Sequence, residues 1–336
     1  MKTKSPTKLE KLWIKKVASF IGKKNDKLSE RTREMYATRI RRIWKLLEPE
    51  LDFKGKNFLN RRVNEVINVI NNSDMADSSK AGSYSAILST YNADSYGIAN
   101  NGKKMYQREI DYWGEKNRNA AKKQEKTESE KEKWVTKEEL LAGRRKLHAK
   151  AMETNDIYDW RDFVMFSLFT LLPPRRAGDY GEMKISRNLD YKGNAVIPIT
   201  TLGKKKFGKF IFNDFKLANK KGKEVFDRKY ISQLPKGEEI LTVLDNWLNI
   251  ARKGYFLLDA RTPVHMSKAI ARLSQKAVGK PINANVFRHM YVENFLETAP
   301  YLSEKEKVAD FMSHTVAQQE LYRKKLEKNE NVKNEK

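Results

Sequence analysis

The chain has 336 residues, of which 39% are hydrophobic, so it is long enough to bury two cores of ordinary domain size. Its 68 Lys and Arg residues outnumber its 43 Asp and Glu residues, and the resulting net charge of +25 favours a polyanionic partner, with nucleic acid first. An anionic membrane is the second candidate, but the sequence has no apolar run long enough to span one, and we expect no membrane association. The N-terminal residues lack the apolar core of a signal peptide, and cysteine is absent. We therefore expect an intracellular protein without disulfides, zinc fingers, metal or other cofactor.

Residues 1–116 predict a small all-helical domain. Apolar residues recur at helical spacing over residues 8–22, 32–48 and 58–71, and a fourth helix is expected after residues 77–79. Basic residues of the second helix fall largely off its apolar stripe: Arg33, Arg41, Arg42 and Lys45. A solvated helix surface has the same pattern, but the net charge leads us to expect contacts with the DNA backbone.

Residues 117–133 are highly charged and almost free of apolar side chains, which predicts an exposed linker. A second domain is expected over residues 134–326, opened by a helix that Thr136 and Glu139 cap together. It should contain a buried helix over residues 158–172 and then three strand-like pieces, 194–202, 206–216 and 223–230, before helices resume. The last residues, 327–336, predict a disordered tail. The expected fold class is mainly α with a small antiparallel β-sheet.

Chemically important residues of this second domain occur in a fixed order. Two arginines follow the buried helix, lysines surround a turn between strands, and a further arginine, a histidine and a tyrosine come from the C-terminal helices. The residues are Arg175, Arg176, Asp179, Lys216, Lys220, Asn285, Arg288, His314 and Tyr322. Capping signals at Ser303–Glu306 and Thr315 predict helices on both sides of His314, which places it in the corner between them. Two arginines, a lysine, a histidine and a tyrosine are the set that phosphoryl transfer through a tyrosine needs.

This order resembles the tyrosine recombinase (phage integrase) family, whose catalytic domain is shared with type IB topoisomerases. The family boxes match Arg176-Ala-Gly-Asp179, a hairpin lysine at Lys216, Asn285-Val-Phe-Arg288, His314 and Tyr322. The segments around Arg175 and Phe212 look closer to recombinases of large eukaryotic DNA viruses and virophages. The resemblance implies a helical core-binding domain before an α+β catalytic domain, and a homo-tetramer on double-stranded DNA. It also implies localisation at DNA, in the host nucleus or at a viral replication site if the protein is viral.

Each residue then has an expected role. Arg176 and Arg288 would clamp the non-bridging phosphate oxygens, because guanidinium groups bind them bidentately, and Tyr322 would attack phosphorus to form a 3′-phosphotyrosyl bond. Lys216 is the expected general acid for the leaving 5′ oxygen, with Lys220 as the alternative. Asp179 is expected to orient Arg176, and Arg175 is the alternative to Arg176.

Two departures from the family pattern leave alternatives open. Asn285 stands where the family has His or Lys, and an amide cannot exchange protons near neutral pH. The interval from His314 to Tyr322 is also one residue short. We expect a metal- and ATP-independent site-specific recombinase, that is, a DNA strand transferase used for integration, excision or resolution. The alternatives are relaxation of DNA like that by a type IB topoisomerase and a non-catalytic basic DNA-binding protein.

Overall fold

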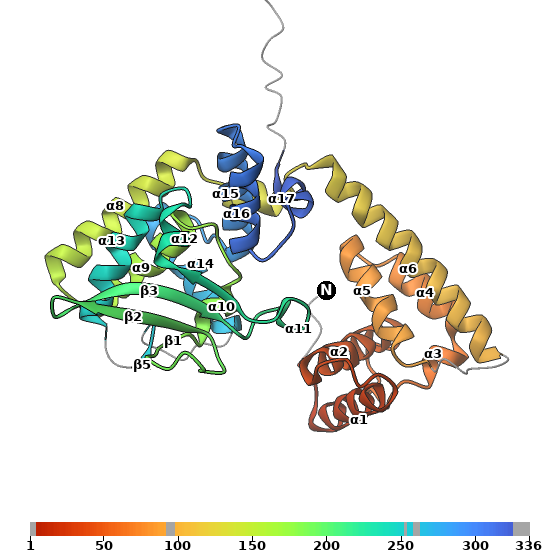
Figure 1. The fold of residues 1–336 in the computed structure, drawn as a ribbon. Coiled ribbons are helices and arrows are strands. Elements are labelled where there is room, and N and C mark those ends of the chain that lie inside the picture. The colour runs from red at the N-terminus through yellow and green to blue at the C-terminus, as the bar shows by residue number, and fades with distance from the viewer. Residues whose placement is uncertain (1–4, 92–97, 252–253, 258–262, 325–336) are drawn as a thin grey trace, which may run out of the picture. The chain divides into compact units, whose positions relative to one another are not determined.

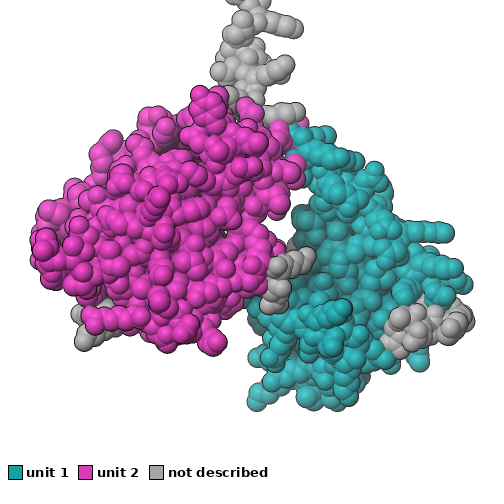
Figure 2. Space-filling view, viewed as in Figure 1, with its two compact units in different colours: residues 1–123 teal, residues 124–336 magenta. Residues whose placement is uncertain are grey.

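The computed structural model describes residues 5–91, 98–251, 254–257 and 263–324 (Figure 1). The chain divides into two compact units, residues 1–123 and residues 124–336, which Figure 2 colours separately. Each unit has its own cluster of buried apolar side chains. The expected fold class is confirmed: the chain is mainly helical with one small sheet. The tail predicted over residues 327–336 lies outside the described residues.

The first unit is built from helices among its described residues. Their bounds are α1 Lys8–Lys24, α2 Glu30–Leu47, α3 Phe58–Arg61, α4 Val63–Asn71, α5 Asp77–Leu88 and α6 Ile98–Lys123. Thr7 caps α1 with Glu10, and Ser29 caps α2. The helix expected over residues 58–71 is interrupted at Arg62, whose φ of −125° is not helical.

A buried carboxylate ties α1, α2 and the chain after α2 together. Glu10 is fully buried and accepts hydrogen bonds from Arg41 Nη2 at 2.6 Å, Arg41 Nε at 2.9 Å and the Phe53 backbone N–H at 3.2 Å. Burial alone would raise the pKa of Glu10, but the hydrogen bonds and charge of Arg41, with the backbone hydrogen bonds of Phe53 and Thr7, lower it to about 2. Glu10 is therefore ionised in the folded unit.

The charged stretch 117–133 differs from the expected linker, because most of it is helical. Helix α6 runs through to Lys123, and α7 covers Glu128–Lys133. Its Ala, Lys, Glu and Gln residues are strong helix formers, and Thr127 with Glu130 makes a capping box at the start of α7. The absence of apolar residues correctly indicated exposure for much of the stretch, but it did not exclude helix.

The second unit places helices around a five-stranded sheet. Its helices continue as α8 Lys137–Thr154, α9 Ile157–Thr170, α10 Ala177–Gly181, α11 Ala218–Lys221, α12 Arg228–Ser232, α13 Gly237–Ile250, α14 Pro263–Val278, α15 Ala284–Glu297, α16 Leu302–Phe311 and α17 Val316–Tyr322. The strands are β1 Lys184–Ile185, β2 Ala195–Thr201, β3 Lys204–Phe212, β4 Glu224–Asp227 and β5 Gly254–Tyr255. Helix α9 is buried along most of its length, as its apolar sequence predicted, and it belongs to the main core of this unit. No described helix is both long and apolar enough to cross a membrane.

The strand order in the sheet is β4-β3-β2-β1-β5. All pairings are antiparallel except that between β1 and β2, so the sheet is mixed rather than purely antiparallel as expected. Strands β1 and β5 have two residues each, too few for a sequence pattern to reveal them. The third expected strand ends early, because Asp227 accepts a hydrogen bond from the Tyr230 N–H and starts α12. Strands β3 and β4 form a hairpin whose connection, residues 213–223, carries α11.

Candidate active site

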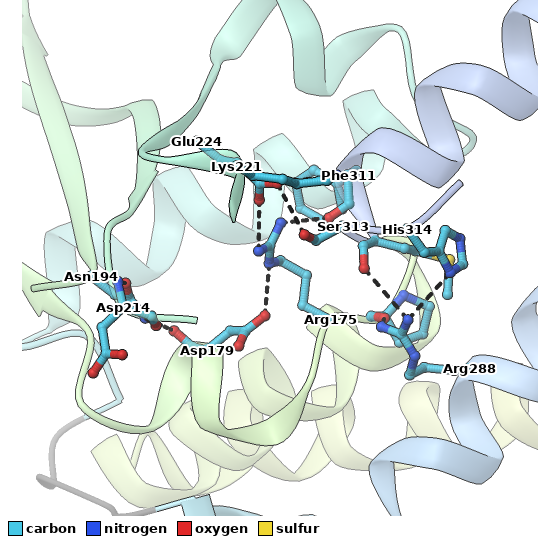
Figure 3. Close-up of polar contacts among 12 residues, drawn as sticks. Arg175, Asp179, Asn194, Asp214, Lys221, Glu224, Arg288, Phe311, Ser313 and His314 are labelled. Atoms are coloured by element: carbon cyan, nitrogen blue, oxygen red, sulfur yellow. Dashed lines mark hydrogen bonds and ion pairs between the residues drawn. The ribbon is translucent and has the colours of Figure 1, made fainter. Parts of the chain in front are cut away.

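Arg175 is a fully buried cation that joins three elements of the second unit (Figure 3). Its Nε donates to Asp179 Oδ2 at 3.0 Å, its Nη2 to Glu224 Oε2 at 2.9 Å and its Nη1 to the Phe311 carbonyl at 2.6 Å. Its guanidinium also lies 3.9 Å from the ring centroid of Phe212. All three nitrogens are engaged, so Arg175 is a structural residue. The expected direct pairing of Asp179 with Arg176 is wrong, since the carboxylate bonds Arg175 instead.

Arg288 enters the same region from α15 and is also buried, with 3% of its surface exposed. Its Nη1 donates to the Pro174 carbonyl at 2.6 Å and its Nη2 to the Met312 carbonyl at 3.4 Å. Pro174 lies in the turn after α9 and Met312 at the end of α16, so Arg288 is fixed between the two. Its guanidinium carbon lies 5.1 Å from the centroid of the Tyr322 ring.

Arg176 is partly exposed at the N-cap position of α10, directly after the Pro173–Pro174 turn. Its Nη1 is buried and has no hydrogen-bond partner among the described residues. Burial lowers the pKa values of Arg288 and His314, and the charge of Arg176 lowers both further. Arg176 therefore presents a buried N–H donor without a described hydrogen-bond partner, and its charge acts on Arg288.

His314 lies in the corner between α16 and α17, as its flanking sequence predicted. Ser313, with a φ of +54°, makes the corner, and its hydroxyl donates to Glu224 Oε1 at 3.0 Å. Burial, and then the charges of Arg288, Arg176 and Lys221, lower the pKa of His314 to about 3, so the ring is neutral at physiological pH. Its Nδ1 lies 3.5 Å from Arg288 Nη2, and a guanidinium can only donate, so Nδ1 accepts and the proton is on Nε2. Nε2 is buried without a partner among the described residues, which makes it a second unused donor.

Tyr322 is the last residue of α17, and its partly buried ring packs against the main core. The ring centroid lies 5.5 Å from that of His314 and 4.8 Å from that of His289. Thr315 caps this helix by accepting from the Gln318 N–H, which confirms the predicted start. The phenol ring is thus beside Arg288 and His314, although the residues come from three different helices or turns.

The lysine expected in the β3–β4 connection is not the one that approaches this cluster. Lys216 is exposed, and the side chain of Lys220 lies outside the described residues. Lys221 Nζ lies 3.5 Å from Glu224 Oε1, and its charge acts on His314. Among the described side chains of this connection, Lys221 is the lysine whose charge acts on His314.

Asn285 and His289 lie on either side of Arg288 in α15. Asn285 is exposed in the first turn, and the described contacts of its side chain include no hydrogen bond. His289 Nδ1 lies 2.9 Å from the Tyr322 carbonyl oxygen, a contact that the sequence patterns did not single out. No spacing signal could have found it, because it depends on where α17 ends.

Most of the α2 side chains expected to contact DNA form hydrogen bonds or ion pairs inside the first unit. Arg41 is 5% exposed and paired with Glu10, so the expectation that it faces outward to DNA is wrong. Lys45 Nζ donates to two backbone carbonyls and lies 3.4 Å from Glu10 Oε1, and Arg33 Nη2 donates to the Asp26 carbonyl at 2.9 Å. Of the four expected DNA contacts, Arg42 is the exposed one. The helical period identified the apolar stripe, but it could not show that α1 brings a carboxylate to its edge.

The arrangement in the second unit is a site for an anion. Arg176, Arg288, His314 and Lys221 supply positive charge or N–H donors, while Glu224 and Asp179 are bonded by Arg175. Among the described residues, no group of three or more Asp, Glu, His or Cys side chains could hold a metal ion. A site of this composition is suited to hold an oxyanion by hydrogen bonds and charge.

No known protein-family model matches the sequence, and no curated protein matches it. Among solved structures, the chain is similar to one described as "Crystal structure of XerA recombinase". The two chains are 14% identical, the match covers 93% of this chain and 94% of the other, and the TM-score is 0.34.

Proposed function

We propose that the protein cuts and rejoins DNA strands through a covalent 3′-phosphotyrosyl intermediate on Tyr322. The observation that carries the proposal is the convergence of the Tyr322 ring with Arg288 and His314, beside Arg176. Two of these residues present buried nitrogens, Arg176 Nη1 and His314 Nε2, that have no partner among the described residues. Buried donors left unpaired are costly, and a phosphodiester oxygen would satisfy both.

The chemistry follows from charge. Attack of the phenol oxygen on phosphorus builds negative charge on the non-bridging oxygens, which Arg176, Arg288 and the neutral His314 Nε2–H would stabilise. The same positive groups would stabilise negative charge on the phenol oxygen as it attacks. The phosphodiester bond is replaced by a phosphotyrosyl bond, and a 5′ hydroxyl reverses the step, so no ATP is consumed.

The leaving 5′ oxygen needs a proton. We assign this role to Lys221 in place of Lys216, because the described Lys221 side chain approaches Glu224 and acts on His314. Lys220 stays the alternative from the same connection. Asn285 would contact phosphate or DNA as a hydrogen-bonding group only, since its amide does not titrate.

The first unit would supply further DNA contacts, through Arg42 and the excess of Lys and Arg over Asp and Glu in the chain. A homo-tetramer on DNA is part of the proposal, as the family resemblance implies.

Single-turnover incubation with a nicked duplex tests the chemistry, because loss of the short fragment after cleavage traps the covalent complex. We expect a protein–DNA adduct that survives denaturation, with the protein on the 3′ phosphate end of the cut strand. If supercoiled, nicked and branched DNA all yield no adduct while duplex binding is retained, the protein is a non-catalytic DNA binder. Relaxation of supercoils without strand exchange would instead favour a topoisomerase activity.

A further inference from the structure

Helix α17, which carries Tyr322, is too short to be stable without contacts to other elements. Helix α17 has seven residues, and Gln319 is its one buried residue. An isolated helix of that length is unstable in water, so its position depends on contacts with the rest of the unit. The last carbonyls of a helix also lack partners within it.

Lys305 of α16 supplies one such contact, 3.1 Å from Glu320, and the segment Gln124–Lys133 supplies others, although it precedes α17 by almost 200 residues in the chain. Gln124 Nε2 donates to the Glu320 carbonyl of α17 at 2.8 Å. Lys324, two residues after Tyr322, donates to the Glu125 carbonyl at 3.1 Å and lies 3.1 Å from Glu130 Oε2. The Glu130 and Lys324 side chains are 13% and 12% exposed, so this ion pair is largely shielded from solvent.

Glu130 is the centre of these contacts. Its Oε2 also accepts from the Thr127 N–H at 2.9 Å, and its Oε1 lies 3.5 Å from His289 Nε2. The opposite nitrogen of His289 lies 2.9 Å from the Tyr322 carbonyl oxygen. Burial alone would raise the pKa of Glu130, but the Thr127 backbone and Lys324 outweigh it and lower that pKa. The carboxylate is therefore ionised and holds Lys324, two residues after Tyr322, while His289 Nδ1 donates separately to the Tyr322 carbonyl.

We propose that Gln124–Lys133 is a clamp that fixes the end of α17, with Glu130 as the positioning residue for Tyr322. This role rests on the proposed function of Tyr322 as the nucleophile. The clamp belongs to the second unit and follows α6 directly in the chain. Glu130 is not one of the groups of the anion site and acts through Lys324.

Lys324→Met, Glu130→Gln and the double variant of the full-length protein test the clamp. Hydrogen exchange of residues 316–324 in the free protein should accelerate about tenfold in each single variant, the effect of losing one charge-assisted hydrogen bond. The double variant should exchange no faster than the faster single variant, because both remove the same contact. Glu128→Gln is the matched control, since the Glu128 side chain lies on the same helix, is 86% exposed and lies 3.0 Å from Lys131. It should leave the exchange unchanged.

The second measurement is adduct formation at saturating DNA. The single variants should form the adduct about tenfold more slowly, with unchanged duplex affinity, because the nucleophile is displaced and the binding surface is kept. A fold defect would instead raise exchange throughout the unit, including α9. Unchanged exchange of residues 316–324 in both single variants, or additive effects in the double variant, would overturn the clamp. If the exchange responds but wild-type protein forms no adduct on any DNA, the clamp holds and the proposed chemistry fails.

Discussion

The two adjacent arginines after α9 should respond to the same substitution in opposite ways. Arg175→Met removes a fully buried cation and leaves two carboxylates, Asp179 and Glu224, without their main partner. Breaking a buried pair in this way costs about 3 to 5 kcal/mol, a large part of the 5 to 15 kcal/mol that stabilises a typical domain. Burial already raises the pKa of Asp179 against the opposing charge of Arg175, so removal of Arg175 should raise it further.

Arg176→Met removes a partly exposed side chain with one buried, unpaired nitrogen, so the free energy of unfolding should change by less than about 0.5 kcal/mol or rise. Its adduct formation should fall about 100-fold or more, the usual effect of losing one donor to transition-state charge. Urea unfolding followed by pulsed hydrogen exchange of α9 peptides measures the stability of this unit separately from the other. The reasoning is refuted if Arg175→Met costs under about 1 kcal/mol, or if Arg176→Met destabilises the unit as much as Arg175→Met does.

Three further predictions concern stability and binding. Because the pKa of Glu10 is lowered from 4.5 to about 2, the first unit should lose about 3 kcal/mol as pH falls from about 4.5 to 2. Glu10→Gln should remove most of this pH dependence when acid unfolding is followed by hydrogen exchange of α2. If stability still falls with pH as steeply in the variant as in the wild type, Glu10 is not the group responsible. Leu202 is 98% exposed and has a φ of +50° in the two-residue β2–β3 turn, where Gly203 also has a positive φ. Asn adopts this backbone conformation more readily than Leu, so Leu202→Asn should raise the free energy of unfolding, measured by thermal melting, by about 0.5 to 1 kcal/mol. Duplex affinity should fall by orders of magnitude between about 50 and 200 mM salt, and a flat salt titration would count against polyanion binding.

The sequence predicted those features that depend on local pattern. Periodicity located most helices, the apolar run over α9 indicated a buried helix, and Thr136 and Thr315 cap the helices expected of them. The corner position of His314 followed from helices on both sides: Thr315 caps the second as predicted, but the first starts at Leu302 after Tyr301, before the cap predicted at Ser303. These features are set by neighbours within a few residues, which a sequence displays directly.

Features that depend on distant residues could not be predicted in this way. Arg41 looked like a surface residue because Glu10, which neutralises it, lies on another helix, 31 residues earlier. The RxxD spacing singled out Arg176 as the partner of Asp179, whereas the contacts with Glu224 and Phe311 bring Arg175, one residue earlier, to the carboxylate. Lys216 and Lys221 share one connection, and only the turn through α11 decides which lysine approaches the site.

The central claim is that Tyr322 forms the covalent bond to DNA, and peptide mapping of the trapped complex tests it most directly. Digestion of the wild-type adduct followed by mass spectrometry should place the nucleotide on the peptide that contains Tyr322. Tyr322→Phe removes the phenolic oxygen and keeps the ring that packs beside His289 and His314, so it should bind duplex like the wild type and form no adduct. An adduct formed by Tyr322→Phe, or a nucleotide mapped to any other residue, would contradict the account.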